Sequence, residues 1–138
     1  MPLELTIVTP SGRAYRGDVD AVVLPGSEGD FGVLPGHERF LSALRCGEVQ
    51  IKTGNQTLYA ASSSGFADVS GDQVTVLVDS CEFATGIDTA RAQRAVERCE
   101  QGMAALERDT GDTEAARIAE FEAALERARN RIAVSQRK

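Results

Sequence analysis

The sequence contains no run of about 20 apolar residues, the length that a helix needs to cross a bilayer. The first ten residues, MPLELTIVTP, include an acidic residue and no basic stretch, so they lack the pattern of a secretory signal peptide. We therefore expect a soluble, intracellular protein. Its 138 residues, 42% of them hydrophobic, predict one compact domain with room for an appendage.

Cysteine and histidine are scarce. The three cysteines, Cys46, Cys81 and Cys99, lie far apart without C-x-x-C spacing, and His37 is the only histidine in the sequence. These spacings do not predict a zinc or redox site. We interpret all three cysteines as small, buried or half-buried side chains in a reducing compartment.

Catalytic and nucleic-acid-binding patterns are also missing. The sequence has no G-x-S-x-G motif, acid-pair motif or phosphate-binding loop, and nothing supports His37 as a base for a Cys46 nucleophile. The net charge of −6 argues against a nucleic-acid surface, which needs a basic stripe. The first 87 residues hold eleven acidic and five basic residues, and the remainder holds ten of each. We therefore expect a non-enzymatic protein with two chemically different parts.

The first part has the pattern of an antiparallel β-sandwich. Short apolar runs, several of them alternating with polar residues, recur about every 8–12 residues between turn signals. The clearest runs are Leu3–Val8, Asp18–Leu24, Gly47–Lys52, Thr57–Ala61, Phe66–Val69 and Gln73–Val78. Between them, the Gly- and Pro-rich run Pro25–Leu44, PGSEGDFGVLPGHERFLSAL, predicts a rigid corner between strands, not a strand, and it displays His37.

The period changes to that of helices from Asp88 onward, where Ala, Arg, Glu and Gln dominate. Two apolar stripes at spacings of three and four residues predict a helical hairpin: Ala92, Ala95, Cys99, Met103, Leu106, and then Ile118, Phe121, Leu125, Ala128, Ile132. Asp109-Thr-Gly-Asp ends the first helix, and Asp112 or Thr113 is expected to cap the second. We predict an α+β fold, with a sandwich domain at 1–85 and a hairpin at 86–138.

The first helical stripe is thin, because most of its members are Ala or Cys. A large apolar side chain contributes about 1.5–3 kcal/mol when it is fully buried, whereas each ordered residue costs about 1–2 kcal/mol of backbone entropy. We therefore predict that the hairpin docks weakly on the sandwich and can exchange partners.

Charged residues in the hairpin allow two interpretations. Asp88 has the position of a helix N-cap, and Arg91 follows one turn later. Arg127 and Arg131 have no acidic neighbour three or four residues away on the helix, and together they form a repulsive i,i+4 pair. Either these arginines are solvated at the end of the chain, or an anionic ligand or partner offsets their repulsion.

Several motifs, in order, carry a resemblance to a known family. They are the GDFGVLPGH corner, the SGFADV and QVTVLVD strands, the IDTARA helix start and the terminal ALERARNRI helix. Together they resemble the epsilon subunit of bacterial-type F-type ATP synthases over essentially the whole chain. The resemblance implies a sandwich of about ten strands with a C-terminal helical hairpin. It also implies a non-catalytic subunit of the rotating central stalk, bound to the gamma subunit and to the polar loops of the membrane rotor ring.

The resemblance also implies roles for individual residues. Glu28, Asp30 and His37 would meet the rotor ring, with Asp30 standing where Glu is common in the family. The hairpin would be a regulatory arm that folds onto the sandwich when ATP binds and blocks hydrolysis when it extends into the alpha/beta head. The implied ATP-binding residues are Glu82, Asp88, Arg91, Ala92, Arg127 and Arg131. ATP would be a regulatory ligand, with no metal and no required cofactor.

The implied location is the cytoplasmic face of a bacterial inner membrane, as a peripheral part of the F1 sector without insertion into the bilayer. The coupling ion, a proton or sodium, is left open by the sequence. The alternative function is a stand-alone nucleotide-sensing adaptor with a ligand-responsive helical lid. A gamma-like partner would distinguish the two functions, because the first requires a large apolar surface on the sandwich.

Overall fold

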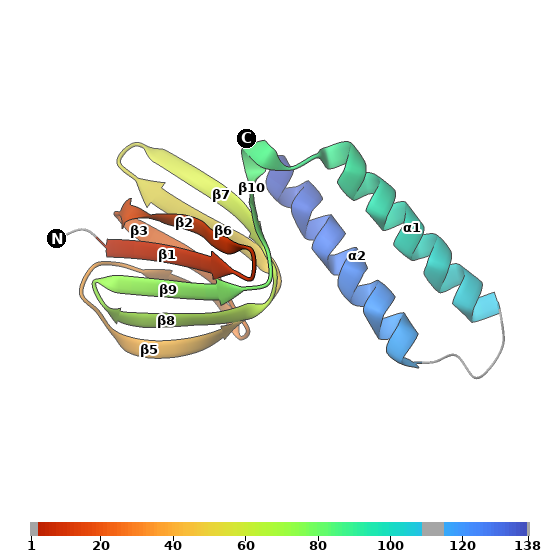
Figure 1. The fold of residues 1–138 in the computed structure, drawn as a ribbon, viewed down its shortest axis with the longest axis horizontal. Coiled ribbons are helices and arrows are strands. Elements are labelled where there is room, and N and C mark those ends of the chain that lie inside the picture. The colour runs from red at the N-terminus through yellow and green to blue at the C-terminus, as the bar shows by residue number, and fades with distance from the viewer. Residues whose placement is uncertain (1–2, 109–114, 138) are drawn as a thin grey trace.

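The structure is a computed structural model that describes residues 3–108 and 115–137, with the backbone alone at 37, 106–108 and 115–116. The described residues form ten strands, one short 3₁₀-helix and two long helices (Figure 1). The strands are β1 (Leu3–Thr9), β2 (Gly12–Val19), β3 (Ala21–Gly26), β4 (Gly29–Val33), β5 (His37–Leu44), β6 (Gly47–Thr53), β7 (Gln56–Ser62), β8 (Gly65–Gly71), β9 (Gln73–Val78) and β10 (Cys81–Phe83). The helices are η1 (Ala84–Gly86), α1 (Thr89–Arg108) and α2 (Ala115–Ser135).

The strands form one continuous sheet in the order β10-β7-β6-β3-β5-β8-β9-β1-β2, with β4 paired to β3. The sheet folds over on itself, so that β5, β8, β9 and β1 lie side by side as one layer (Figure 1). The pairing of β1 with β9 is parallel, whereas the other strand pairs described are antiparallel. Together with the two helices, this architecture confirms the predicted α+β fold.

Alternation along the strands places the core between the two layers. On β1, Leu3, Leu5 and Ile7 are fully buried, and the residues between them are half-buried. The same alternation on β9 buries Val74 and Val76. The large side chains that are fully buried come from seven strands: Leu3, Leu5, Ile7, Val19, Val22, Leu24, Val33, Val49, Ile51, Val69, Val74 and Val76.

The expectation of a corner between Pro25 and Leu44 is wrong for most of that run. β4 pairs antiparallel with β3, and Val33 is fully buried against the core. Turns remain only between Gly26 and Gly29, where Gly29 adopts a φ of 138°, and at 35–36, where Gly36 adopts a φ of 79°; both values favour glycine. Glycine-rich sequence is compatible with a short strand such as β4, which pairs with β3 off the main path of the sheet.

The hairpin forms as the sequence predicts. Asp88 caps α1, because its Oδ1 accepts a hydrogen bond from the backbone N–H of Arg91 at 3.1 Å. The stripe residues Ala92, Cys99, Leu125 and Ala128 are buried. The expected caps of the second helix, Asp112 and Thr113, lie outside the described residues.

The hairpin projects from one end of the sandwich, with α2 nearer to the strands than α1 (Figure 1). A cluster of small apolar side chains, here called the docking seam, joins the two parts: Ala61, Ala84, Ile87 and Val134. The seam contains no leucine, and Tyr59 packs against it. That the hairpin docks weakly stays a prediction. The division into domains at residue 85 stays a prediction, because η1 continues across it.

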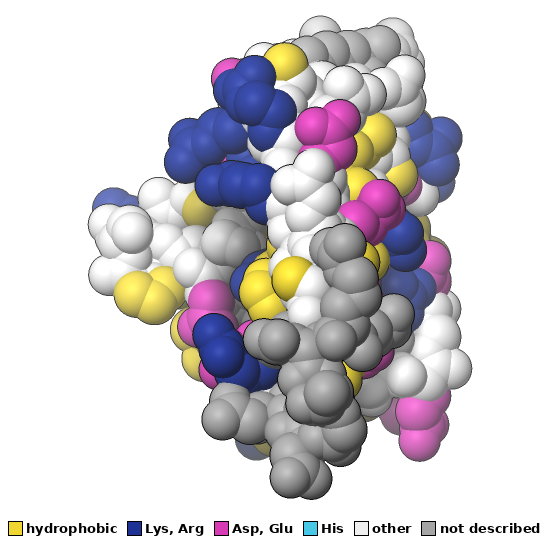
Figure 2. Space-filling model, turned by 90° about the vertical axis from the view of Figure 1, so that its right-hand side faces the viewer, with side chains coloured by type: hydrophobic (Ala, Val, Ile, Leu, Met, Phe, Trp, Pro, Cys, Tyr) yellow, Lys and Arg dark blue, Asp and Glu magenta, His cyan; other side chains and the backbone are white. Residues whose placement is uncertain are grey.

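The outward side of the hairpin is mostly polar. Figure 2 shows Lys and Arg side chains gathered along one edge of this face, with Asp and Glu beside them and only small apolar patches between. In the described part of the chain, neither long helix has the length and hydrophobicity that a membrane span requires.

Candidate functional site

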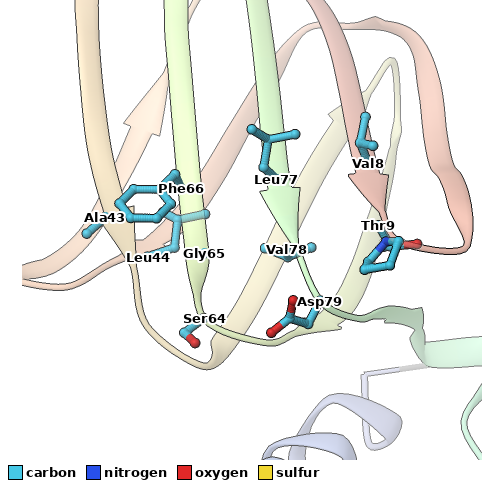
Figure 3. A pocket seen from close by; sticks show the side chains of 11 residues that line it. Val8, Thr9, Ala43, Leu44, Ser64, Gly65, Phe66, Leu77, Val78 and Asp79 are labelled. Carbon is cyan, nitrogen blue, oxygen red and sulfur yellow. The ribbon is translucent and has the colours of Figure 1, made fainter.

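A row of exposed and half-buried apolar side chains crosses the outer face of four strands. Register pairs Val8 of β1 with Leu77 of β9, Leu77 with Phe66 of β8, and Phe66 with Ala43 of β5. These four residues are here called the apolar row, and they line an open hollow of about 640 Å³ (Figure 3). The Phe66 side chain is 55% exposed and Leu77 is 50% exposed.

Two features fix and extend the apolar row. A Cβ built on Gly65 would lie 2.0 Å from the carbonyl oxygen of Leu77, so glycine lets β8 and β9 approach closely beside Phe66. Leu41 lies two residues before Ala43 on β5, on the same strand face, and is 70% exposed. Large exposed apolar patches on soluble proteins mark docking sites. The row could not be predicted from the sequence. Leu77 lies between the buried residues Val76 and Val78, and because all three are apolar, the pattern does not show which face is exposed.

A second site lies in the cleft between the sandwich and the hairpin, with a volume of about 260 Å³. Its polar walls are the serines of the β7 and β9 strand ends on one side and the arginines of α2 on the other. The polar residues that line it are Ser62, Ser63, Ser80, Glu82, Arg127, Asn130 and Arg131. Small residues complete it, Ala95 of α1 among them. The cleft therefore combines positive charge with hydroxyl groups, a combination that suits anions.

Arg131 and Glu82 form a two-point ion pair across this cleft. Nη2 of Arg131 donates a hydrogen bond to Oε2 of Glu82 at 3.1 Å, and Nε lies 3.0 Å from Oε1. The side chains are 23% and 40% exposed, so solvent screens the pair only in part. The spacing of charges along α2 gives Arg131 no acidic neighbour on its own helix. Its acidic partner is Glu82 of β10, 49 residues earlier in the chain.

Arg127 differs from Arg131. It lines the same cleft one helical turn earlier and is exposed, and the described residues give it no ion pair or hydrogen bond. Cys46 lies beside it and lines the cleft too. Burial, followed by the charge of Glu126, raises the pKa of the Cys46 thiol, and the charge of Arg127 opposes that rise. The Arg127 guanidinium is therefore available to an anion.

The other residues implied for ATP binding lie at the start of α1. Asp88 is occupied in capping the helix, Arg91 is exposed, and Ala92 is fully buried. None of the three lines the cleft as described, where α1 contributes Ala95 instead. The structure therefore brings Glu82, Arg127 and Arg131 together and leaves Asp88, Arg91 and Ala92 outside their cleft.

The residues implied for rotor-ring contact do not form one patch. Glu28 lies in the β3–β4 turn, and Asp30 forms an ion pair with Arg45. Gly26, at the same turn, pairs with Leu44, whereas the backbone of His37 begins β5 at the opposite end. Seven residues of strand separate these ends by roughly 20 Å. The His37 side chain lies outside the described residues.

The same geometry separates His37 from Cys46. Cys46 follows the end of β5 that is nearer to the hairpin, and His37 begins the strand. A proton transfer between their side chains would require hydrogen-bond distance. The backbones of His37 and Cys46 lie at opposite ends of β5.

Three contacts of the last turns of α2 were missed by the sequence analysis. Nδ2 of Asn130 donates a hydrogen bond to the Gly47 carbonyl at 2.9 Å. Nε of Arg137 donates to Oε2 of Glu48 at 3.2 Å, and its guanidinium lies 5.1 Å from the centroid of the Tyr59 ring. Val134, in the seam, shares this face, and the spacing of Asn130, Val134 and Arg137 is the signal that could have indicated it.

Comparison with known proteins gives consistent matches. The family described as the ATP synthase, delta/epsilon chain, beta-sandwich domain matches residues 2–84. An ATP synthase epsilon chain of Nitratidesulfovibrio vulgaris is 43% identical over 132 residues, which cover 96% of this chain and 94% of the relative. An ATP synthase epsilon chain of Halalkalibacterium halodurans is 38% identical, with 98% of each chain covered.

Solved structures show the same fold at lower identity. A chain in the mitochondrial ATP synthase of Euglena gracilis superposes with a TM-score of 0.77 at 23% identity, covering 94% of this chain and 78% of that one. A chain in the central stalk and c-ring structure of the Tetrahymena thermophila enzyme gives 0.58 at 11% identity, covering 99% and 96%. The matched family model and the curated relatives show that the chain belongs to the ATP synthase epsilon chain family.

Proposed function

We propose that this chain is a central-stalk subunit of an F-type ATP synthase, that its sandwich couples the gamma subunit to the rotor ring, and that its hairpin inhibits ATP hydrolysis. Epsilon chains are non-catalytic, and the catalytic sites of the complex lie on other subunits. The assembly places the chain in the membrane-associated F1 sector. Relatives from bacteria support a location on the cytoplasmic face of the bacterial inner membrane.

The exposed apolar row is the observation that carries the proposal. A free-standing adaptor has no need for Phe66 and Leu77 at about half exposure beside Leu41 at 70%. Burying such side chains against a partner contributes about 25 cal/mol for each Å² of apolar surface removed from water. The row faces away from the core and lies on the β1-β9-β8-β5 layer, so a gamma subunit can cover it while the hairpin occupies the end of the sandwich (Figure 1).

Contact with the rotor ring is assigned to the β3–β4 turn. Glu28 and Asp30 lie there in the exposed part of the chain, and Arg45 holds the Asp30 carboxylate in place. A polar ring loop could pair with the remaining lone pairs of these carboxylates. Because His37 starts the opposite end of β5, we assign it to a separate contact.

The hairpin can act as a brake because its attachment is weak. Ile87 and Val134 are the larger members of the docking seam, and each contributes about 1.5–3 kcal/mol when buried. The partly exposed ion pairs of Arg131 and Arg137 with the sandwich add about 0–1 kcal/mol each. A ligand at 100 times its Kd stabilises the state that it binds by about 2.7 kcal/mol, which is comparable to the contribution of one of these two seam residues. ATP in the cleft can therefore favour the docked state, and an extended hairpin can reach the alpha/beta subunits.

Retention of the gamma subunit tests the proposal. We expect the purified chain to co-purify with gamma, and Phe66→Asp to abolish retention, because a charge in the row cannot be buried without a partner. Leu34→Asp is the matched control, since Leu34 is 63% exposed but lies outside the row. Failure of the unaltered chain to bind gamma would favour the adaptor function instead.

A further inference from the structure

We infer that Glu82 competes with the nucleotide for Arg131: its carboxylate holds the hairpin docked without a ligand, and a triphosphate must displace it. This inference rests on the proposed regulation by ATP. It changes the role that the family resemblance gives to Glu82, from a ligand-binding group to an internal substitute for the ligand.

The geometry of the Glu82–Arg131 pair supports its role in holding the hairpin docked, and the pair is here called the latch. Glu82 is held in β10, where it lies opposite Ala61 of β7, and Ala61 is part of the docking seam. Arg131 precedes the seam residue Val134 by one turn of α2. Nη2 of Arg131 donates a hydrogen bond to Oε2 at 3.1 Å, and the buried Nε lies 3.0 Å from Oε1 within ion-pair distance but has no hydrogen-bond partner among the described residues. The pair therefore ties the edge of the sandwich to the last turns of the hairpin.

The two arginines of the cleft consequently have different roles. Arg131 already has an anionic partner, and Arg127 has none among the described residues. Arg127 faces the serine-lined wall of the cleft, which includes Ser63 and Ser80. A phosphate group entering the cleft meets Arg127 first. It reaches Arg131 only when Glu82 turns away.

Electrostatics sets the direction of the effect. The Glu82 carboxylate is a negative charge inside the site that is to receive a triphosphate, and like charges at such distances repel. It also accepts the hydrogen bond of the Arg131 Nη2, which the phosphate would use, while the buried Nε of Arg131 has no hydrogen-bond partner among the described residues. The docked hairpin is therefore populated without ATP, and the affinity for ATP is lower than the same cleft would have without this charge.

Hydrogen–deuterium exchange of the full chain without nucleotide tests the latch. We expect Glu82→Gln and Arg131→Gln to raise the exchange rate of the α2 amides near Val134 by about fivefold or more, since a partly screened pair is lost. Arg129→Gln is the matched control, because Arg129 pairs with Glu100 of α1 and not with the sandwich. Unchanged exchange in both latch variants would overturn the inference.

A charge reversal separates the latch from a folding defect. The double variant Glu82→Arg with Arg131→Glu keeps one charge of each sign across the cleft. We expect its α2 amides to exchange more slowly than those of either single reversal. If the double variant exchanges as fast as the singles, the pair is not what holds the helix.

Calorimetric titration with ATP and with inorganic tripolyphosphate tests the competition. The Asn130, Val134 and Arg137 contacts remain in Glu82→Gln, so we expect a mainly docked chain that binds both ligands about tenfold more tightly than the unaltered chain. Arg127→Gln should bind neither. Weaker binding by Glu82→Gln alone would overturn the competition and leave ATP regulation standing. No binding by either chain would overturn both.

Discussion

The aromatic ring of Phe121 on α2 lies against the backbone of Gly102 on α1. A Cβ at residue 102 would lie 2.6 Å from two atoms of that ring, closer than side chains pack. Glycine costs about 1 kcal/mol relative to alanine within a helix. At this position the cost is offset by the close approach of the two helices.

Gly102→Ala should therefore have opposite effects in two backgrounds. In the unaltered chain we expect a loss of about 1–2 kcal/mol of hairpin stability, because the ring must move. In a Phe121→Ala background the same change should stabilise α1 by about 1 kcal/mol. Amide exchange of α1 measures both effects, and the same sign in both backgrounds would show that the ring is not the cause.

The close approach of β8 and β9 makes a second glycine sensitive. A Cβ on Gly65 would lie 2.0 Å from a backbone carbonyl, which cannot move aside as a side chain can. We expect Gly65→Ala to lower the free energy of unfolding of the sandwich by about 2–4 kcal/mol in urea titrations. Gly32→Ala is the control, because its Cβ would meet open space within β4. Equal losses would contradict the explanation.

The thiol of Cys81 predicts a pH dependence. Burial, followed by the charge of Glu82, raises the pKa of Cys81 from 9.0 to about 11. The Cys81 thiol therefore stays protonated in the native state at pH values where it is deprotonated in the unfolded chain. The associated stability is fully present below pH 9 and falls as the pH rises from 9 to 11, by about 2–3 kcal/mol in total. Urea titrations across this range should show the decline, and Cys81→Ala should flatten it.

Removal of the hairpin should release the brake. A chain that ends at Gly86 keeps the ten strands of the sandwich and the apolar row but loses α1 and α2. We expect the assembled head to hydrolyse ATP several times faster with this chain than with the full-length chain, while gamma is still retained. The measurement is the ATPase rate of the head assembled with each chain, compared at equal subunit occupancy. Equal rates would leave the hairpin without an inhibitory role.

The periodic elements could be predicted from sequence, because burial is decided locally within them. Alternation located β1 and β9, and spacings of three and four residues located the Cys99 and Leu125 faces of the hairpin. β4 was missed because glycine and proline obscure alternation, although Phe31 and Val33 point toward the core. The resemblance, and not the periodicity, supplied the family.

The candidate site was less predictable because its contacts join distant parts of the chain. The Glu82–Arg131 pair spans 49 residues, and no local pattern encodes it. The exposed face of β9 could not be assigned either, since Leu77 lies between two buried valines and all three are apolar. The six residues implied for ATP binding remain a prediction, with three of them gathered in one cleft.

The parallel pairing of β1 with β9 also constrains the order in which the protein can fold during its synthesis. Leu5, which is made first, has its partner Val74 some seventy residues later, so the core cannot close until β9 has left the ribosome. The hairpin is synthesised after β9 and β10, so it can dock on a sandwich whose strands are all available to pair. A nascent chain halted before β9 should therefore remain sensitive to protease, whereas one halted after β10 should resist it.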